Sequence, residues 1–73
     1  MSKQTTYGNI KNGDQVWIQG HLFTVSDLHT ETVHGLSGVI RFTGTLPESD
    51  DLFHTPYNGG QYGGIISLPC TIE

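Results

Sequence analysis

Hydrophobic and polar residues alternate with a period of two over residues 14–19 and again over residues 22–28. This alternation is typical of antiparallel strands that bury one face and expose the other. Gly20 and His21 separate the two runs, and a two-residue connection that contains glycine favours a tight hairpin turn. We therefore predict a β-hairpin here, with room for a bulge in its second strand just before Leu28.

Two more strands are predicted beyond this hairpin. Residues 39–46 form a third alternating run, and residues 65–72 carry an apolar side chain at every second position. Pro69 falls on the opposite face of this last run. Because proline cannot donate a hydrogen bond to a neighbouring strand, it confines the predicted strand to a sheet edge or a bulge. The polar, β-branched stretch 29–34 either continues the second strand or forms a short strand of its own.

The remaining segments carry no strand pattern. Residues 1–10 are polar and unpatterned, so we expect a flexible N-terminal arm that docks on the domain through Tyr7 or Ile10. Residues 47–64 form a long irregular connection, and a connection of this length in a compact domain is usually functional or disordered. Its only helix-like window is 47–53, which is long enough for about one capped turn.

Four or five short strands without a long helix predict an all-β fold, a small antiparallel barrel or curled sheet, as one domain over residues 11–73. The composition supports this fold class, because the chain has ten glycines and no alanine, which favours strands and turns over helices. The predicted core consists of the apolar residues on the buried faces of these strands: Val16, Ile18, Phe23, Val25, Leu28, Ile40, Phe42, Ile66, Leu68 and Ile72.

The first predicted hairpin carries a resemblance to a known fold. The run Gly13-Asp14-Gln15-Val16-Trp17-Ile18, followed by Gly20 and Phe23-Thr24-Val25, resembles the opening of small β-barrels of the KOW and Tudor type. That resemblance implies a barrel that binds partners through its loops and an aromatic-lined edge. The compact, acidic chain without an enzyme motif is also similar in general character to small accessory proteins of bacteriophages.

Charge argues against nucleic acid as a partner. The formal net charge is −4, and after Lys3 and Lys11 the chain has one cation, Arg41, against seven acids. Affinity for a nucleic-acid backbone comes mostly from lysine and arginine side chains that neutralise phosphates. We therefore expect a protein partner rather than DNA or RNA.

Cysteine usage and hydropathy bear on the compartment. Cys70 is the only cysteine, so no intrachain disulfide can form, which favours a reducing environment. No apolar run approaches the roughly 20 residues that span a bilayer, and no signal-peptide pattern opens the chain. From these features we expect a cytoplasmic protein that does not contact membranes.

The segment 57–64 is the strongest candidate for a binding surface. It combines two tyrosines with four glycines, and glycine lets the backbone approach a partner closely while tyrosine supplies a large amphipathic contact. The predicted partner-binding side chains in this segment are Tyr57, Asn58, Gln61 and Tyr62. The alternative is a turn whose tyrosines simply cover the mouth of the barrel.

A second candidate surface pairs Trp17 with Arg41. Each residue alternates away from the predicted core, so both fall on the outer face if their strands share one sheet. An exposed tryptophan beside an arginine is typical of interface hot spots. The alternative is a tryptophan lying across the sheet with the arginine stacked on it.

Metal binding and catalysis have weaker support. The candidate ligands are His21, His29, His34, His54 and Cys70, together with an acidic cluster of Glu48, Asp50 and Asp51. None has the spacing of a zinc or calcium motif, and Cys70 falls in register with core positions. We therefore predict no metal site, no cofactor and no catalytic residues.

The sequence thus favours a non-catalytic protein-binding module, of the accessory or inhibitor kind that acts on a host protein in phage systems. Self-association into a homo-oligomer is compatible with such a small domain. The alternative function is a small-molecule or metal-assisted site formed between copies of a homo-oligomer.

Overall fold

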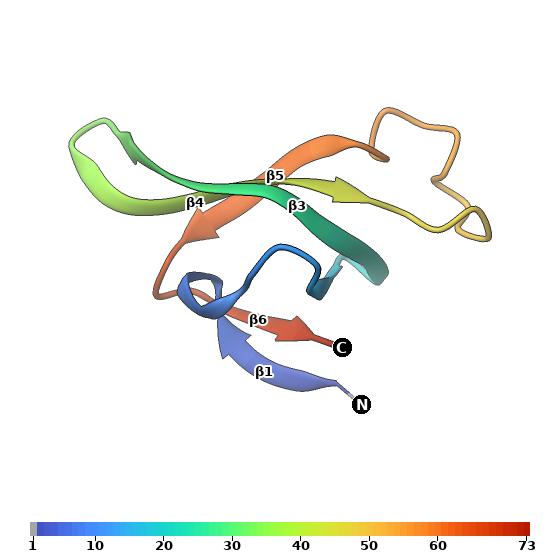
Figure 1. The fold of residues 1–73 in the computed structure, drawn as a ribbon, viewed down its shortest axis with the longest axis horizontal. Coiled ribbons are helices and arrows are strands. Elements are labelled where there is room, and N and C mark those ends of the chain that lie inside the picture. The colour runs from blue at the N-terminus through green and yellow to red at the C-terminus, as the bar shows by residue number, and fades with distance from the viewer. Residues whose placement is uncertain (1) are drawn as a thin grey trace.

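The computed structural model describes residues 2–73, apart from the side chains at positions 33, 36 and 37. The elements in chain order are β1 (Lys3–Thr6), η1 (Tyr7–Asn9, one 3-10 turn), β2 (Gln15–Ile18), β3 (His21–Val33), β4 (Leu36–Thr45), β5 (Gly60–Ile65) and β6 (Pro69–Ile72). All six strands belong to one antiparallel sheet in the order β1-β6-β2-β3-β4-β5 (Figure 1). Edges β1 and β5 do not pair, so the predicted all-β fold is confirmed as a curled sheet that does not close, with six strands rather than four or five.

The predicted hairpin is confirmed as β2 and β3, but its turn lies at Gln19 and Gly20 rather than at Gly20 and His21, because His21 already pairs with Ile18. Gln19 and Gly20 both have positive φ, which is the geometry of the tight turns that join twisted antiparallel strands. The pairing register shifts between Ser26 and His29, and Asp27 also has positive φ, so the predicted bulge is present. The stretch 29–34 continues this strand rather than forming a separate one, except that β3 ends at residue 33.

Residues 3–10 were predicted as part of a flexible N-terminal arm, and the structure instead gives them a strand and contacts with the core, while residue 1 lies outside the described part of the chain. Lys3–Thr6 pairs with β6, and the backbone N–H of Tyr7 donates to the carbonyl of Leu68 over 3.1 Å. Ile10 is buried in the core, so the predicted docking through this residue is confirmed. The strand escaped prediction because an edge strand needs only backbone hydrogen bonds to its neighbour and no alternating apolar face.

The prediction of one strand over residues 65–72 is also wrong. β5 ends at Ile65, and the chain turns before β6 begins at Pro69, with the Leu68 N–H donating to the Ile65 carbonyl over 3.0 Å. Ile66 and Leu68, which were expected in the core, are 42 % and 46 % exposed. Their period-two spacing is accidental, since it continues across a turn.

The prediction that residues 47–64 are irregular holds only up to residue 59, because Gly60–Ile65 forms the edge strand β5. Glycine is required for this strand to approach β4: a Cβ on Gly63 would lie 1.9 Å from the Ile40 carbonyl oxygen. The window 47–53 forms turns rather than a helix. We call residues 46–59 the long loop.

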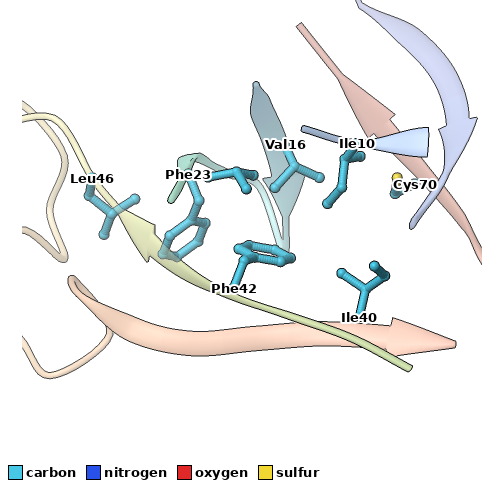
Figure 2. Packing of buried hydrophobic residues seen from close by; sticks show 8 residues of the cluster. Ile10, Val16, Phe23, Ile40, Phe42, Leu46 and Cys70 are labelled. Atoms are coloured by element: carbon cyan, nitrogen blue, oxygen red, sulfur yellow. The ribbon is translucent and has the colours of Figure 1, made fainter. Parts of the chain in front are cut away.

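The core lies on the inner face of the curled sheet, where the Phe42 side chain is completely buried beside Phe23 (Figure 2). The core cluster is Ile10, Val16, Phe23, Val25, Ile40, Phe42, Leu46 and Cys70. Five of these were predicted, Ile10 and Leu46 were not, and Cys70 occupies the core register expected for it. Of the other predicted core residues, Ile18, Leu28 and Ile72 pack partly buried against this cluster. Within residues 2–73, no helix has the length and apolar character needed to cross a membrane.

Candidate binding site

A pocket of about 380 Å³ opens on the inner face of the sheet, at the end where the β2–β3 turn meets the long loop. It is lined by Ile18, Gln19, His21, Phe23, Leu52, Tyr57 and Tyr62. Tyr62 comes from the edge strand β5, which is not hydrogen-bonded to β2 or its turn. The pocket therefore lies where the sheet curls without closing. Leu52 and Tyr57 of the long loop line its remaining side.

Aromatic rings form one wall of the pocket. The ring of Tyr62 packs against Phe23 at a centroid distance of 4.6 Å and against Phe42 at 6.3 Å. Gly44 makes this packing possible, because a Cβ there would lie 2.9 Å from the rings of both Phe23 and Tyr62. The core residues Phe23 and Phe42 therefore support the Tyr62 ring in this wall.

The Tyr62 hydroxyl is committed to the long loop. It donates a hydrogen bond to the backbone carbonyl of Tyr57 over 2.5 Å. Burial raises the pKa of Tyr62, so the hydroxyl keeps its proton and remains a donor at neutral pH. Tyr62 thus anchors the loop to the sheet, while the Tyr57 side chain on the other side of this bond is 60 % exposed.

The long loop is ordered by hydrogen bonds from its own side chains. Asn58 Oδ1 accepts from the backbone N–H of Leu46 over 2.8 Å, and Asn58 Nδ2 donates to the Phe53 carbonyl over 2.9 Å. The hydroxyl of Thr55 donates to the Leu52 carbonyl over 2.7 Å. These contacts support the loop backbone beside the pocket, which is formed without a ligand in this structure.

A histidine and a carboxylate meet at the pocket across 29 positions of the sequence. His21 Nδ1 lies 2.8 Å from Asp50 Oδ2, and the other carboxylate oxygen of Asp50 accepts from the Leu52 N–H over 2.8 Å. The hydrogen bond from His21 is the main cause that lowers the pKa of Asp50 from the ordinary value of 3.8. Asp50 therefore links the β2–β3 turn to the long loop as an ionised acceptor.

Of the six residues predicted to bind a partner, the structure brings Tyr57 and Tyr62 together at this pocket. Both the oxygen and the nitrogen of the Asn58 side-chain amide instead form hydrogen bonds with the loop backbone. Gln61 is exposed on β5, where it pairs with Thr43, and so points to the face opposite Tyr62.

Trp17 and Arg41 share the outer face but are not neighbours. Both residues pair with β3, Trp17 with Leu22 at its start and Arg41 with His29 farther along it. The stretch between these two partners spans roughly 20 Å of strand. Trp17 is engaged by the C-terminal residue, since its Nε1 donates to a carboxylate oxygen of Glu73 over 2.7 Å. The predicted Trp–Arg surface is therefore two separate points.

The pairing of His21 with Asp50 escaped sequence reasoning. His21 is one of four histidines spread along the chain, and Asp50 belongs to an acidic cluster 29 positions away. No local pattern links the two residues. Among residues 2–73, no group of three or more His, Cys, Asp or Glu side chains lies close enough to hold a metal ion. Within the same described residues, no serine, threonine or cysteine lines the pocket, so the oriented histidine has no adjacent nucleophile of these types.

No protein-family model, no curated protein and no solved structure matches this chain. Function must accordingly be argued from the site itself, that is, from a preformed aromatic pocket with one oriented histidine.

Proposed function

We propose that this chain is a protein-binding module that holds a side chain of its partner in the pocket under the long loop. The observation that carries the proposal is the position of Tyr57. It is a large aromatic residue, 60 % exposed, on a loop whose backbone is fixed by Asn58 and Tyr62. An exposed aromatic side chain on a hydrogen-bonded backbone, at the rim of an apolar pocket, is the usual composition of an interface anchor.

Charge indicates the kind of partner. The long loop carries the exposed residues Glu48 and Asp51, and the chain as a whole is acidic. A neutral or basic protein surface complements this charge, whereas a nucleic-acid backbone does not. On this proposal the module acts without catalysis, as an accessory or inhibitor does. The resemblance to KOW and Tudor barrels and to phage accessory proteins remains a prediction.

A second candidate function is binding of a free small molecule in the same pocket. Its volume of about 380 Å³ lies within the range of roughly 300–1,000 Å³ that ligand pockets occupy. The pocket is built entirely by one chain, so this function does not require contact between copies of a homo-oligomer.

Panning a phage-displayed library of random peptides on the folded protein tests the proposal. The selected peptides are then measured against two variants, Tyr57→Ala at the pocket and Arg41→Gln on the outer face. We expect enriched peptides that lose about tenfold or more in affinity with Tyr57→Ala, as aromatic anchors do, and that bind Arg41→Gln like the wild type.

Two results would contradict this site. Peptides that bind Tyr57→Ala normally but lose affinity for Arg41→Gln would move the interface to the outer face. Failure to enrich any peptide, combined with binding of small aromatic compounds at the pocket, would favour the second candidate function.

A further inference from the structure

The ionised carboxylate of Asp50 determines which nitrogen of His21 carries the hydrogen. A carboxylate accepts hydrogen bonds and cannot donate one, so the close contact between His21 Nδ1 and Asp50 Oδ2 requires the hydrogen to be on Nδ1. In neutral imidazole the other nitrogen then has a free lone pair. In the neutral ring, His21 Nε2 is thus a hydrogen-bond acceptor.

Nε2 has no partner within the described residues, since the side-chain hydrogen bonds of His21 there are those between Nδ1 and Asp50. The imidazole ring lines the pocket and its side chain is 30 % exposed. A ligand in the pocket can therefore reach a ring whose tautomer and orientation are already fixed, which reduces the entropic cost of forming the hydrogen bond.

The remaining lining restricts the ligand further. Ile18, Phe23 and Leu52 are apolar, and the Tyr62 hydroxyl is already donating to the loop backbone. Gln19 offers a second polar group, at the exposed turn. Among the described residues that line the pocket, none is a lysine or arginine. The carboxylate of Asp50 contacts His21. An anionic group such as a phosphate or carboxylate is disfavoured beside the neutral imidazole, because it would meet the Asp50 carboxylate without a compensating lysine or arginine.

We propose that the pocket selects a phenol ring, the side chain of a tyrosine in the partner, whose hydroxyl donates to His21 Nε2 while its ring packs against Phe23 and Tyr62. Asp50 is the positioning residue that holds the histidine in the accepting tautomer. This inference rests on the proposed function and adds the chemistry of the side chain that is bound. It also predicts that phosphorylation of that tyrosine abolishes binding, since the phosphate removes the donor and adds negative charge.

Three small probes of nearly equal shape test the proposal by NMR titration of the backbone amides: p-cresol, its methyl ether 4-methylanisole, and toluene. The ring and methyl group are shared, and only p-cresol has a donor. We expect all three to shift amides around the pocket, with p-cresol binding about tenfold more tightly, as one well-placed hydrogen bond provides.

Two variants assign the effect to the histidine and the carboxylate. His21→Phe keeps an aromatic ring but removes the acceptor, so p-cresol and toluene should bind equally well. In the wild type, side-chain ¹⁵N shifts of His21 should report a neutral ring with hydrogen on Nδ1 and none on Nε2. In Asp50→Leu this signature should change, and the preference for p-cresol should fall, while dispersed amide spectra confirm that each variant is folded.

The outcomes separate this inference from the proposed function. Equal binding of p-cresol and toluene to the wild type would overturn the phenol specificity but leave the pocket as a binding site. Retention of the p-cresol preference in His21→Phe would overturn the role of His21. If none of the probes shifts the pocket amides, the phenol inference is wrong, and peptide selection decides the proposed function independently.

Discussion

The two ends of the curled sheet are closed in different ways. At one end the N-terminal segment packs into the inner face, with Ile10 in the core beside Ile40 and Cys70 (Figure 2). At the other end Leu52 and Tyr57 of the long loop line the pocket, which remains open. Buried side chains fill the first end, which we call the closed end. The second end keeps the open pocket beside the long loop.

The difference follows from how each segment uses its residues. The closed end is sealed by apolar contact and by backbone hydrogen bonds from η1 to the residues that join β5 and β6, including Gly8 N–H to the Ile66 carbonyl at 3.0 Å. The long loop instead directs polar groups such as Asn58 and Thr55 back to its own backbone. Because the loop forms these hydrogen bonds to its own backbone, it can stay ordered without filling the pocket.

The largest effect is expected at the closed end. Ile10→Ala should destabilise the domain by about 3 kcal/mol, because it removes a buried side chain from the small core at this end. Tyr57→Ala, which removes a larger but exposed side chain at the other end, should cost less than about 0.5 kcal/mol. Urea unfolding of both variants checks this contrast, which fails if the two losses are similar.

The next effect concerns the support of the pocket. Asn58→Ala should cost about 1–2 kcal/mol, because it leaves the backbone N–H of the buried residue Leu46 without its acceptor. Asn9→Ala is the matched control, since the Asn9 amide donates only to an exposed threonine hydroxyl. If the two variants unfold at the same urea concentration, the loop is not held as described.

A smaller effect is expected from the hydroxyl of Tyr62. Tyr62→Phe keeps the contacts with Phe23 and Phe42 but removes the hydrogen bond to the Tyr57 carbonyl, and should cost about 0.5–1 kcal/mol. Tyr62→Ala should cost several times more, because it also removes the aromatic wall. Thermal unfolding distinguishes the two roles, and equal losses for both variants would refute the structural role of the ring.

The smallest effect is a response to acid at the pocket end. The pKa of Asp50 is lowered in the folded protein, so its contribution to stability is fully present above the ordinary carboxyl value of 3.8 and is lost as pH falls through the lowered value. The amide of Leu52, which donates to Asp50, should therefore shift in an NMR pH titration with a midpoint below 3.8. A midpoint at or above that value would contradict the interaction with His21.

These contrasts also explain how far the sequence could predict the fold. The alternation around Val16, Phe23 and Phe42 identified the central strands and most of the core, because those strands bury one face. The edge strands β1 and β5 carry threonine, glutamine and glycine and are held by backbone pairing. Such strands leave no apolar alternation, and the accidental spacing of Ile66 and Leu68 concealed the turn between β5 and β6.

The candidate site was predictable only in part. The composition of segment 57–64 predicts Tyr57 and Tyr62 as binding residues, and the structure places both at the pocket. Nothing in the sequence could bring His21 to Asp50, because their contact depends on where the long loop folds back over the β2–β3 turn. Contacts between a turn and a distant loop are set by the tertiary fold and carry no periodic signal.

The most direct test of the account is a set of intermolecular NOEs between the protein and a tightly bound peptide from the library selection. The central claim is that the partner enters the pocket at the loop-covered end of the sheet. The account predicts NOEs from an aromatic ring of the peptide to the side chains of Phe23, Leu52 and Tyr62. NOEs confined to Trp17 and Arg41 on the outer face would contradict it.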